Sequence, residues 1–198
     1  VKEGLPVLCI CLTRNFSGSM EAAMNAKAVL REEFSGAEIE VLDSRLATGL
    51  QGLFVKEAAR LRDDGIPLKT AVKALERIRN SGRIFFTTKD LKYLERGGRI
   101  GKAACLVGSM LEIKPLLRFY DGELGPSELC RGRKRSLQKV TEWLLQYVER
   151  EKIDLKGYRF ATGEGLPVPE YRSFCEDLRE RLKAADNQPA DWDEIQIG

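Results

Sequence analysis

The 198-residue chain is 43% hydrophobic, 32% charged and 8% aromatic, and its formal net charge is +3. These totals are typical of a globular protein that buries its core in one large or two small domains. No apolar run approaches the roughly 20 residues that a membrane span needs, and the start lacks the layout of a signal peptide. A charge this small gives little support to nucleic-acid binding. We therefore expect a cytoplasmic protein that neither binds nucleic acid nor inserts stably into a membrane.

The cysteine and histidine counts limit the chemistry. The five cysteines are far apart except for Cys9 and Cys11, which strand alternation places on one face of a strand. A zinc site would need a second close pair or histidines, and the chain has no histidine. We therefore expect reduced, buried thiols and no metal. The absence of histidine also removes the commonest general base, which lowers the expectation of hydrolase chemistry.

The first half of the chain alternates strand and helix patterns. A continuous apolar run at 6–12 predicts a strand buried on both faces. The elements that follow are a helix at 20–34, a strand at 37–44, helices at 46–65 and 67–79, a strand at 82–88 and a short helix at 91–95. Because the connections are short, this order favours βαβ units and a doubly wound sheet.

The pattern changes near residue 88. A β-hairpin is expected within 115–133, with Asp121-Gly122 as its turn. The elements predicted after it are a helix at 134–151, a strand at 157–165, a helix at 169–185 and a strand that starts at 191.

These elements predict an α/β protein with a parallel or mixed sheet and helices on both faces. The expected division is a first α/β domain at 1–88 and a second α/β domain, which contains the hairpin, at 89–198. Buried strands lie close to both ends of the sequence, and a sheet made only of these strands would have unprotected edges. We therefore expect the sequence to be a fragment of a longer chain.

The loop "RNFSGSMEAA" is the first candidate site. It follows a predicted parallel strand and precedes a helix, at the sheet edge where α/β proteins bind ligands. Ser17, Gly18 and Ser19 bring hydroxyl and backbone N–H groups to a helix N-terminus, which favours an anion. Simple capping of the helix by Ser17 or Ser19 explains the same residues. Nucleophilic catalysis by serine would need a base, and no histidine is present.

The next strand-to-helix turn, in "DSRLATGLQGL", carries three further polar side chains, Asp43, Ser44 and Thr48. They could line the same crevice or cap the helix that follows. Capping is the favoured interpretation.

The stretch 93–115, "YLERGGRIGKAACLVGSMLEIKP", fails as a phosphate-binding loop. The Walker pattern needs glycine where the chain has Arg96 and a hydroxyl residue where it has Ala103. Gly97-Gly98 instead predicts the end of a helix. The run "KAACLVGSML" predicts a helix that is apolar on nearly all sides and therefore buried. It is either a plain core helix or, because its side chains are small, the wall of an apolar ligand pocket.

Five segments in order, "LTRNFSGSMEAA", "VLDSRLATGLQGL", "TTKDLKYLERGGRIG", "GSMLEIKPLL" and "DGEL", resemble the DegV family of bacterial fatty-acid-binding proteins. The resemblance runs from about Pro6 to Trp143 and more weakly to the end. It implies a two-domain α/β protein that holds one long-chain fatty acid in an internal tunnel, with the carboxylate near the domain interface. It also implies a carrier that is not an enzyme and has no cofactor besides the fatty acid. In some bacteria the implied partner is a fatty-acid kinase, which phosphorylates the bound carboxylate using ATP.

The resemblance also implies residue roles. Ser17 matches the carboxylate-binding serine of the family's Ser-Gly-Thr loop, with the N–H groups of Gly18 and Ser19 as helpers, and Ser19 stands where the family has threonine. Arg99 matches the family's arginine near the head group. The acyl chain would lie along an apolar wall that includes Ala103, Leu106, Val107 and Met110. The family's upstream Thr-Ser pair and its C-terminal His-Thr-Gly-Pro-Gly loop have no counterpart here, so we expect residues 1–198 alone to bind fatty acid weakly or not at all.

A different class of function stays open. It is an α/β enzyme that acts on a small phosphorylated substrate through "SGS" and "GGRIGK". An acyl chain along 103–111 would decide for the carrier, and a phosphate at Ser17–Ser19 beside a titratable side chain would favour the enzyme. A purely structural role is a third alternative.

Overall fold

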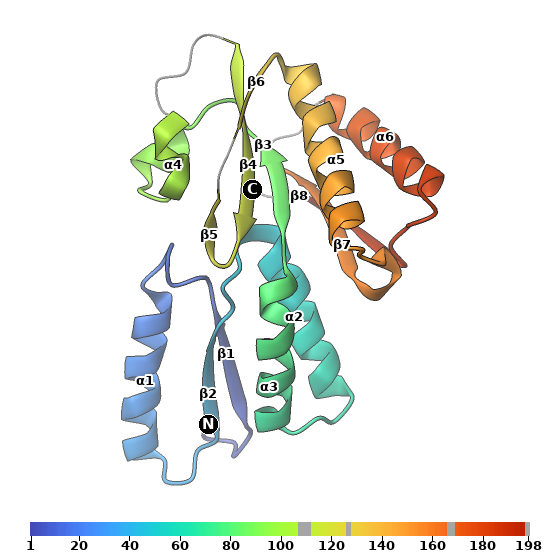
Figure 1. The fold of residues 1–198 in the computed structure, drawn as a ribbon. Helices are drawn as coiled ribbons and strands as arrows, with labels where there is room; N and C mark the ends of the chain where they lie inside the picture. The colour runs from blue at the N-terminus through green and yellow to red at the C-terminus, as the bar shows by residue number, and fades with distance from the viewer. Residues whose placement is uncertain (107–111, 126–127, 166–168, 197–198) are drawn as a thin grey trace. The chain divides into compact units, whose positions relative to one another are not determined.

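The computed structural model describes residues 1–106, 112–125, 128–165 and 169–196. The chain divides into two compact α/β units, of which unit 1 is Val1–Arg83 with Tyr120–Glu123, and unit 2 is Ile84–Phe119 with Leu124–Gly198. The mixed α/β class predicted from the sequence is confirmed (Figure 1). The division into domains 1–88 and 89–198 that the sequence suggested stays a prediction about the domains of the complete protein.

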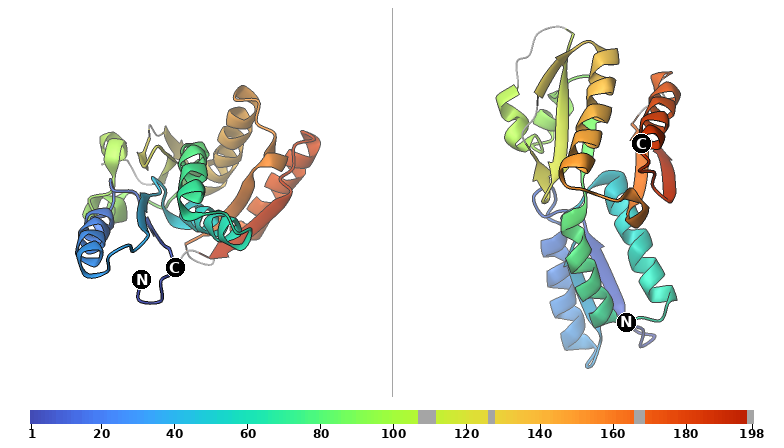
Figure 2. Two further views of the ribbon diagram at one scale, coloured as in Figure 1. Left: turned by 90° about the horizontal axis from the view of Figure 1, so that it is seen from below. Right: turned by 45° about the vertical axis from the view of Figure 1, so that its right-hand side comes forward.

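Unit 1 is built on two parallel strands, β1 (Val7–Cys11) and β2 (Ile39–Asp43), paired from Val7↔Ile39 to Cys11↔Asp43. The helix α1 (Ser19–Glu33) lies on one side of this strand pair (Figures 1 and 2). The other side holds α2 (Thr48–Asp63) and α3 (Leu68–Ile78), and a single 3₁₀ turn, η1 (Arg79–Ser81), follows α3. All five predicted elements are present.

Alternation along β1 sends its side chains to both faces of the strand pair. Leu8 and Ile10 pack against a core cluster on the α2 and α3 side, formed by Leu42, Leu46, Phe54, Leu61, Ala71 and Leu75. Cys9 and Cys11 lie on the other face, where the Cys11 thiol donates to the carbonyl of Ser19 in α1 at 3.7 Å. The strand is therefore covered on both faces, as its continuous apolar sequence predicts.

Unit 2 contains an antiparallel sheet centred on β4 (Ile113–Tyr120), which pairs with β3 (Ile84–Thr87), β5 (Glu123–Leu124) and β6 (Glu128–Arg131). The long helix α5 (Arg133–Arg150) packs on β3 and β6. The β4–β5 hairpin confirms the predicted turn, because Asp121 and Gly122 have φ of 52° and 86°, as a two-residue hairpin turn requires.

The strand β3 corrects one expectation. Its place after two βαβ-like segments predicted a third strand of a doubly wound sheet, but it pairs antiparallel with β4, from Ile84↔Phe119 to Thr87↔Leu116. The reason lies in the side chains on its two faces. Phe85 packs with Trp143 of α5 and its neighbours, whereas Phe86 packs with Leu117 and its neighbours, so unit 2 buries both faces of the strand.

Unit 2 also contains a pair of parallel strands. The strands β7 (Arg159–Glu164) and β8 (Asp191–Gln196) are joined by α6 (Glu170–Ala184), and the 3₁₀ turn η3 (Leu155–Gly157) precedes β7. Thr162 lies at the centre of a buried polar network, since Tyr171 O–H and Trp192 Nε1–H each lie 3.0 Å from its Oγ1. Burial raises the pKa of Tyr171 to about 12, which keeps this phenol neutral.

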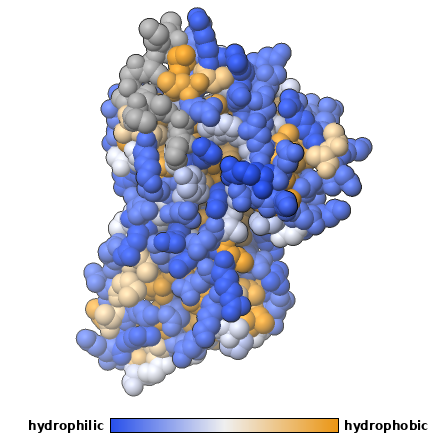
Figure 3. Space-filling model, viewed as in Figure 1, coloured by the Kyte–Doolittle hydropathy of each residue, from blue (hydrophilic) through white to orange (hydrophobic). Residues whose placement is uncertain are grey.

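The surface is mostly hydrophilic in the view of Figure 3, with apolar patches over α1, where Met24 and Val29 are exposed. Within the described residues, no helix is long and apolar enough to cross a membrane.

Leu75 tests the unit 1 core. Its side chain is fully buried in α3, so Leu75→Ala should lower the free energy of unfolding by about 2–5 kcal/mol. Ile78→Ala in the same helix is the control, because Ile78 is 42% exposed and its truncation should cost roughly 1 kcal/mol or less. Urea unfolding of both variants measures the difference, and equal losses would contradict the assigned core.

Candidate functional site

The loop between β1 and α1 begins at Leu12 and ends at Gly18. Thr13 N–H donates to the carbonyl of Leu46 at 3.0 Å, and Phe16 N–H donates to the carbonyl of Thr13 at 3.0 Å. The first bond ties the loop to the connection between β2 and α2, and the second folds it back on itself. The loop is therefore shaped by main-chain bonds at the carboxyl edge of the strand pair, where ligand sites of α/β folds occur.

Ser17 is half-buried, and its Oγ accepts a hydrogen bond from Ser19 N–H at 3.2 Å. Gly18 is the residue before the helix, and both Gly18 and Ser19 are exposed. The N-cap of α1 is Gly18 and no side chain caps this helix, so the capping interpretation is wrong, and the Ser17 hydroxyl instead bonds the N–H two residues ahead of it. This bond uses a lone pair of the hydroxyl and leaves its hydrogen for an anionic partner.

The adjoining charges are exposed and paired. Arg14 Nη2 donates to Glu21 Oε1 at 3.0 Å, across the start of α1. This hydrogen bond lowers the pKa of the Glu21 carboxyl, so the first turn of α1 carries a carboxylate matched by a guanidinium. A ligand carboxylate at Ser17 would therefore depend on the hydroxyl and backbone N–H groups more than on a net positive charge.

The second strand-to-helix turn corrects the capping interpretation of its side chains. The residue before α2 is Ala47, and no side chain caps this helix. Asp43 Oδ1 accepts from Arg45 N–H at 2.9 Å and Ser44 Oγ accepts from Leu46 N–H at 3.1 Å, so both side chains stabilise the loop itself. Thr48 begins α2 with φ of 53°, which is a strained conformation for a β-branched residue.

The tip of the β4–β5 hairpin also belongs to unit 1 and contacts the first loop. Thr13 Oγ1 donates to the carbonyl of Gly122 at 2.9 Å, and Asn15 Nδ2 donates to the same oxygen at 3.3 Å. Thr13 is 1% exposed. Sequence reasoning missed this contact because the dipeptide Asp121-Gly122 signals only a turn and says nothing about what the turn touches.

Arg99 lies in unit 2, just after the short helix α4 (Lys92–Arg96). The predicted helix stop is confirmed: Gly98 has φ of 68°, and Arg99 N–H donates to the carbonyl of Leu94 at 3.0 Å. The Arg99 side chain is exposed, and its guanidinium donates to the carbonyl of Gly97. An exposed arginine held at a helix end can meet an anion from solvent.

Ala103 is fully buried in unit 2. It packs in an apolar cluster with Leu91 and Leu117, flanked by Phe86, Leu94 and Ile100. The segment Gly101–Leu106 is a 3₁₀ helix, η2, rather than the start of the predicted α-helix, and its first residue, Gly101, has φ of 53°, outside the α-helical range.

The other predicted wall residues cannot be placed in the same way. Val107 and Met110 lie outside the described residues, as does the side chain of Leu106. Ser17, Gly18 and Ser19 are brought together in unit 1, whereas Arg99 and Ala103 belong to unit 2. Their convergence on one ligand stays a prediction.

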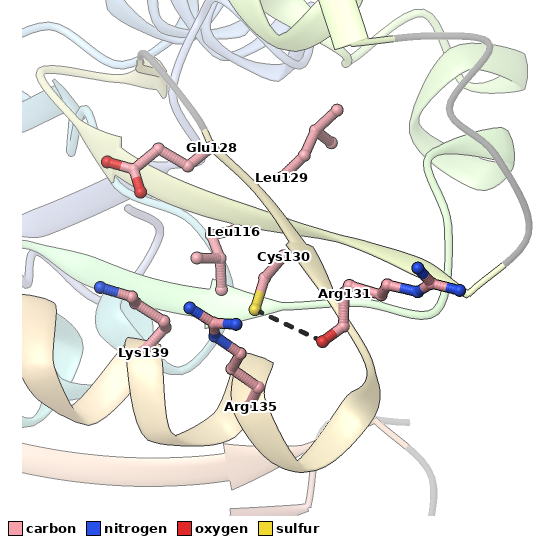
Figure 4. Close-up of a pocket in the computed structure, with 7 residues that line it drawn as sticks. All are labelled: Leu116, Glu128, Leu129, Cys130, Arg131, Arg135 and Lys139. Atoms are coloured by element: carbon pink, nitrogen blue, oxygen red, sulfur yellow. Dashed lines mark hydrogen bonds between the residues drawn. The ribbon is translucent and has the colours of Figure 1, made fainter.

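A hollow of about 200 Å³ lies between β6 and the start of α5 in unit 2. Figure 4 shows Arg135 and Lys139 extending from α5 toward the strands, with Leu116 and Cys130 facing them. This volume is below the roughly 300 Å³ at which ligand pockets begin. None of the predicted site residues lines the hollow, so it is not the predicted tunnel.

The four cysteines whose side chains are described are free thiols. The sulfur atoms of Cys9 and Cys11 are 3.9 Å apart, which confirms that they share one face of β1. Burial, followed by the neighbouring Cys9, raises the pKa of Cys11 from 9.0 to about 11. Among the described residues, no cluster of three or more His, Cys, Asp or Glu side chains has the arrangement of a metal site.

We compared the sequence and the structure of the chain with those of known proteins. The sequence model of the family described as "uncharacterised protein, DegV family" matches residues 1–198. A DegV domain-containing protein of Clostridium perfringens is 31% identical over 187 residues, which are 94% of this chain and 63% of that protein. The chain therefore spans somewhat less than two thirds of the length of this relative.

The chain is also similar to solved structures of fatty-acid-binding proteins. A stearic-acid-binding protein from Eubacterium ventriosum is 31% identical, with a TM-score of 0.84 over 96% of this chain and 63% of that one. The Fak B3 protein of the Streptococcus pneumoniae fatty acid kinase, loaded with linoleic acid, is 23% identical, with a TM-score of 0.76 over 96% of this chain and 64% of that one. The second likeness is one of fold.

The raised pKa of Cys11 predicts a loss of stability in alkali. A thiol whose pKa rises on folding contributes stability that is complete below its unfolded pKa of 9.0 and is lost as the pH rises through about 11. The free energy of unfolding of Cys11→Ala should therefore fall less between these two pH values than that of the wild-type protein. Urea titrations at both pH values measure the difference, and parallel losses would contradict the prediction.

Proposed function

We propose, from the fact that this chain belongs to the DegV family, that it is the larger part of a protein that binds a long-chain fatty acid and carries it. The observation that carries the proposal is the half-buried Ser17 hydroxyl at the N-terminus of α1. A relative of 31% identity is a stearic-acid-binding protein, which supports the same class of ligand.

The head group of such a ligand suits this loop. A carboxylate accepts hydrogen bonds only, and Ser17 O–H with the N–H groups at the start of α1 are donors. The helix dipole adds a favourable interaction with a negative charge at this end. We assign Ser17 to the carboxylate, with the backbone N–H of Gly18 as a second donor, while Ser19 N–H, which donates to Ser17 Oγ, orients the Ser17 hydroxyl.

The tail supplies most of the affinity in this proposal. Each buried CH₂ contributes about 0.8 kcal/mol, so a long acyl chain outweighs a single head-group bond. In this structure Ala103 is fully covered by its apolar cluster, as the plain-core alternative expects, so its place in an acyl-chain wall rests on the family resemblance. We assign the wall to Ala103 together with Leu106, Val107 and Met110.

The carrier presents its ligand to a partner rather than converting it. The family resemblance supports a fatty-acid kinase as the partner, which would phosphorylate the bound carboxylate using ATP in the cytoplasm. Arg99 is exposed and positively charged, which suits a contact with the acyl phosphate or with the kinase. In this proposal the protein needs no cofactor and has no catalytic residue of its own.

Ser17→Ala tests the head-group assignment. Loss of a hydrogen bond to a charged group should weaken stearate binding by about tenfold or more, measured as a dissociation constant on the full-length natural protein that contains this sequence. Ser35→Ala is the control, since Ser35 is an exposed serine in the turn after α1.

Mass spectrometry of lipids extracted from the same purified proteins gives a second measurement. Wild type and Ser35→Ala should carry fatty acid, and Ser17→Ala should carry less. Recovery of no fatty acid from the wild-type protein would overturn the carrier proposal. A small phosphorylated molecule in its place would favour the enzyme alternative.

Arg99→Ala separates binding from presentation. Since Arg99 is exposed, the variant should bind stearate as well as the wild-type protein does. Acyl-phosphate formation with a fatty-acid kinase and ATP should fall by about tenfold or more, as expected for a lost transition-state or partner contact. Arg96→Ala is the matched control, because Arg96 is exposed in the last turn of α4. An unchanged rate in Arg99→Ala would refute the assignment.

A further inference from the structure

Thr13 and the hairpin tip form a contact that the proposed function does not use. We propose that Thr13 and Gly122 are positioning residues, which hold the loop 12–18 in the conformation that lets Ser17 meet the ligand carboxylate. This inference rests on the proposed function. The ligand atoms touch neither residue in this proposal, and the two residues act through the loop.

Thr13 is held at three separate atoms. Its N–H donates to the carbonyl of Leu46 at 3.0 Å, its carbonyl accepts from Phe16 N–H at 3.0 Å, and its Oγ1 donates to the carbonyl of Gly122 at 2.9 Å. The side chain is 1% exposed, so water does not compete for these bonds. The base of the loop is thereby fixed from its main chain and its side chain together.

Ser17 is the neighbour of Phe16, whose N–H closes this turn onto Thr13. Asn15, which lies between Thr13 and Ser17 in the chain, donates a second hydrogen bond to the carbonyl of Gly122 at 3.3 Å. A carbonyl oxygen has two lone pairs, and Thr13 and Asn15 use both of them. Two residues of the five that precede Gly18 are therefore anchored to one atom, which limits the positions that Ser17 can take.

Gly122 is required at the tip for two reasons. Its φ of 86° is a conformation that side-chain-bearing residues rarely adopt. A Cβ built on it would lie 2.7 Å from Thr13 Oγ1, closer than real Cβ contacts come, and 3.2 Å from Asn15 Nδ2, which is tighter than most of them. The carbonyl of Gly122 reaches the loop because no side chain stands between them.

The position of the serine matters for binding because a donor misplaced by about 1 Å loses most of its bond to a bound anion. If the bond served stability alone, its loss would weaken binding only by raising the fraction of unfolded protein. If the bond positions the serine, its loss weakens binding even when all of the protein is folded. The two roles therefore differ in a measurable way.

The test uses the full-length natural protein and stearate as the probe, at a temperature where every variant is folded. Thr13→Val removes the hydroxyl and keeps the shape, and Thr13→Ser keeps the hydroxyl. We expect stearate to bind about tenfold more weakly to Thr13→Val, and within about twofold of wild type to Thr13→Ser. Leu61→Ala, in the core of unit 1, is a destabilised control with a lowered Tm and unchanged affinity.

A second variant covers the case in which Thr13→Val does not fold. Asn15 is exposed, so Asn15→Ala should fold and still weaken stearate binding, because it removes one of the two bonds to Gly122. Stearate affinities of Thr13→Val or Asn15→Ala equal to that of Leu61→Ala would overturn the positioning role. A wild-type protein that binds no stearate would overturn the proposed function itself, so the two failures are distinguishable.

Discussion

The parallel pairing of β1 with β2 is the constraint on which the candidate site depends. The strands end together at Cys11↔Asp43, and the hydrogen bonding continues past their ends through Ser44 N–H to the carbonyl of Cys11 and Thr13 N–H to that of Leu46. Because parallel strands end at the same edge of a sheet, both strand-to-helix loops must lie side by side. The loop 12–18 is thus brought to this edge by main-chain geometry, and the side chains of Thr13 and Asn15 then fix it to the hairpin tip.

Most elements could be predicted because their signals are local. A continuous apolar run specified β1, and Gly65 and Gly98 ended helices with positive φ. The partner of β3 could not be predicted in this way. Its sequence is compatible with a parallel or an antiparallel neighbour, and the choice depends on Phe85 and Phe86 finding their clusters within unit 2.

The same distinction applies to the candidate site. Ser17 could be found from sequence because a hydroxyl before a helix has a local meaning. Asp43 and Ser44 were misassigned as helix caps because short polar side chains bond the nearest available N–H, here two residues ahead in the loop. The contact between Thr13 and Gly122 spans 109 residues, and no periodicity or spacing relates the two positions.

The hairpin tip has a further consequence for how the molecule can be divided. Since Tyr120–Glu123 belongs to unit 1, the chain passes between the units three times, after Arg83, Phe119 and Glu123. Unit 1 is therefore discontinuous, and a truncation at Arg83 would discard part of it. Such a truncated protein would lack the acceptor of the Thr13 hydroxyl. The loop 12–18 can therefore complete its hydrogen bonds only after residue 122 has been synthesised.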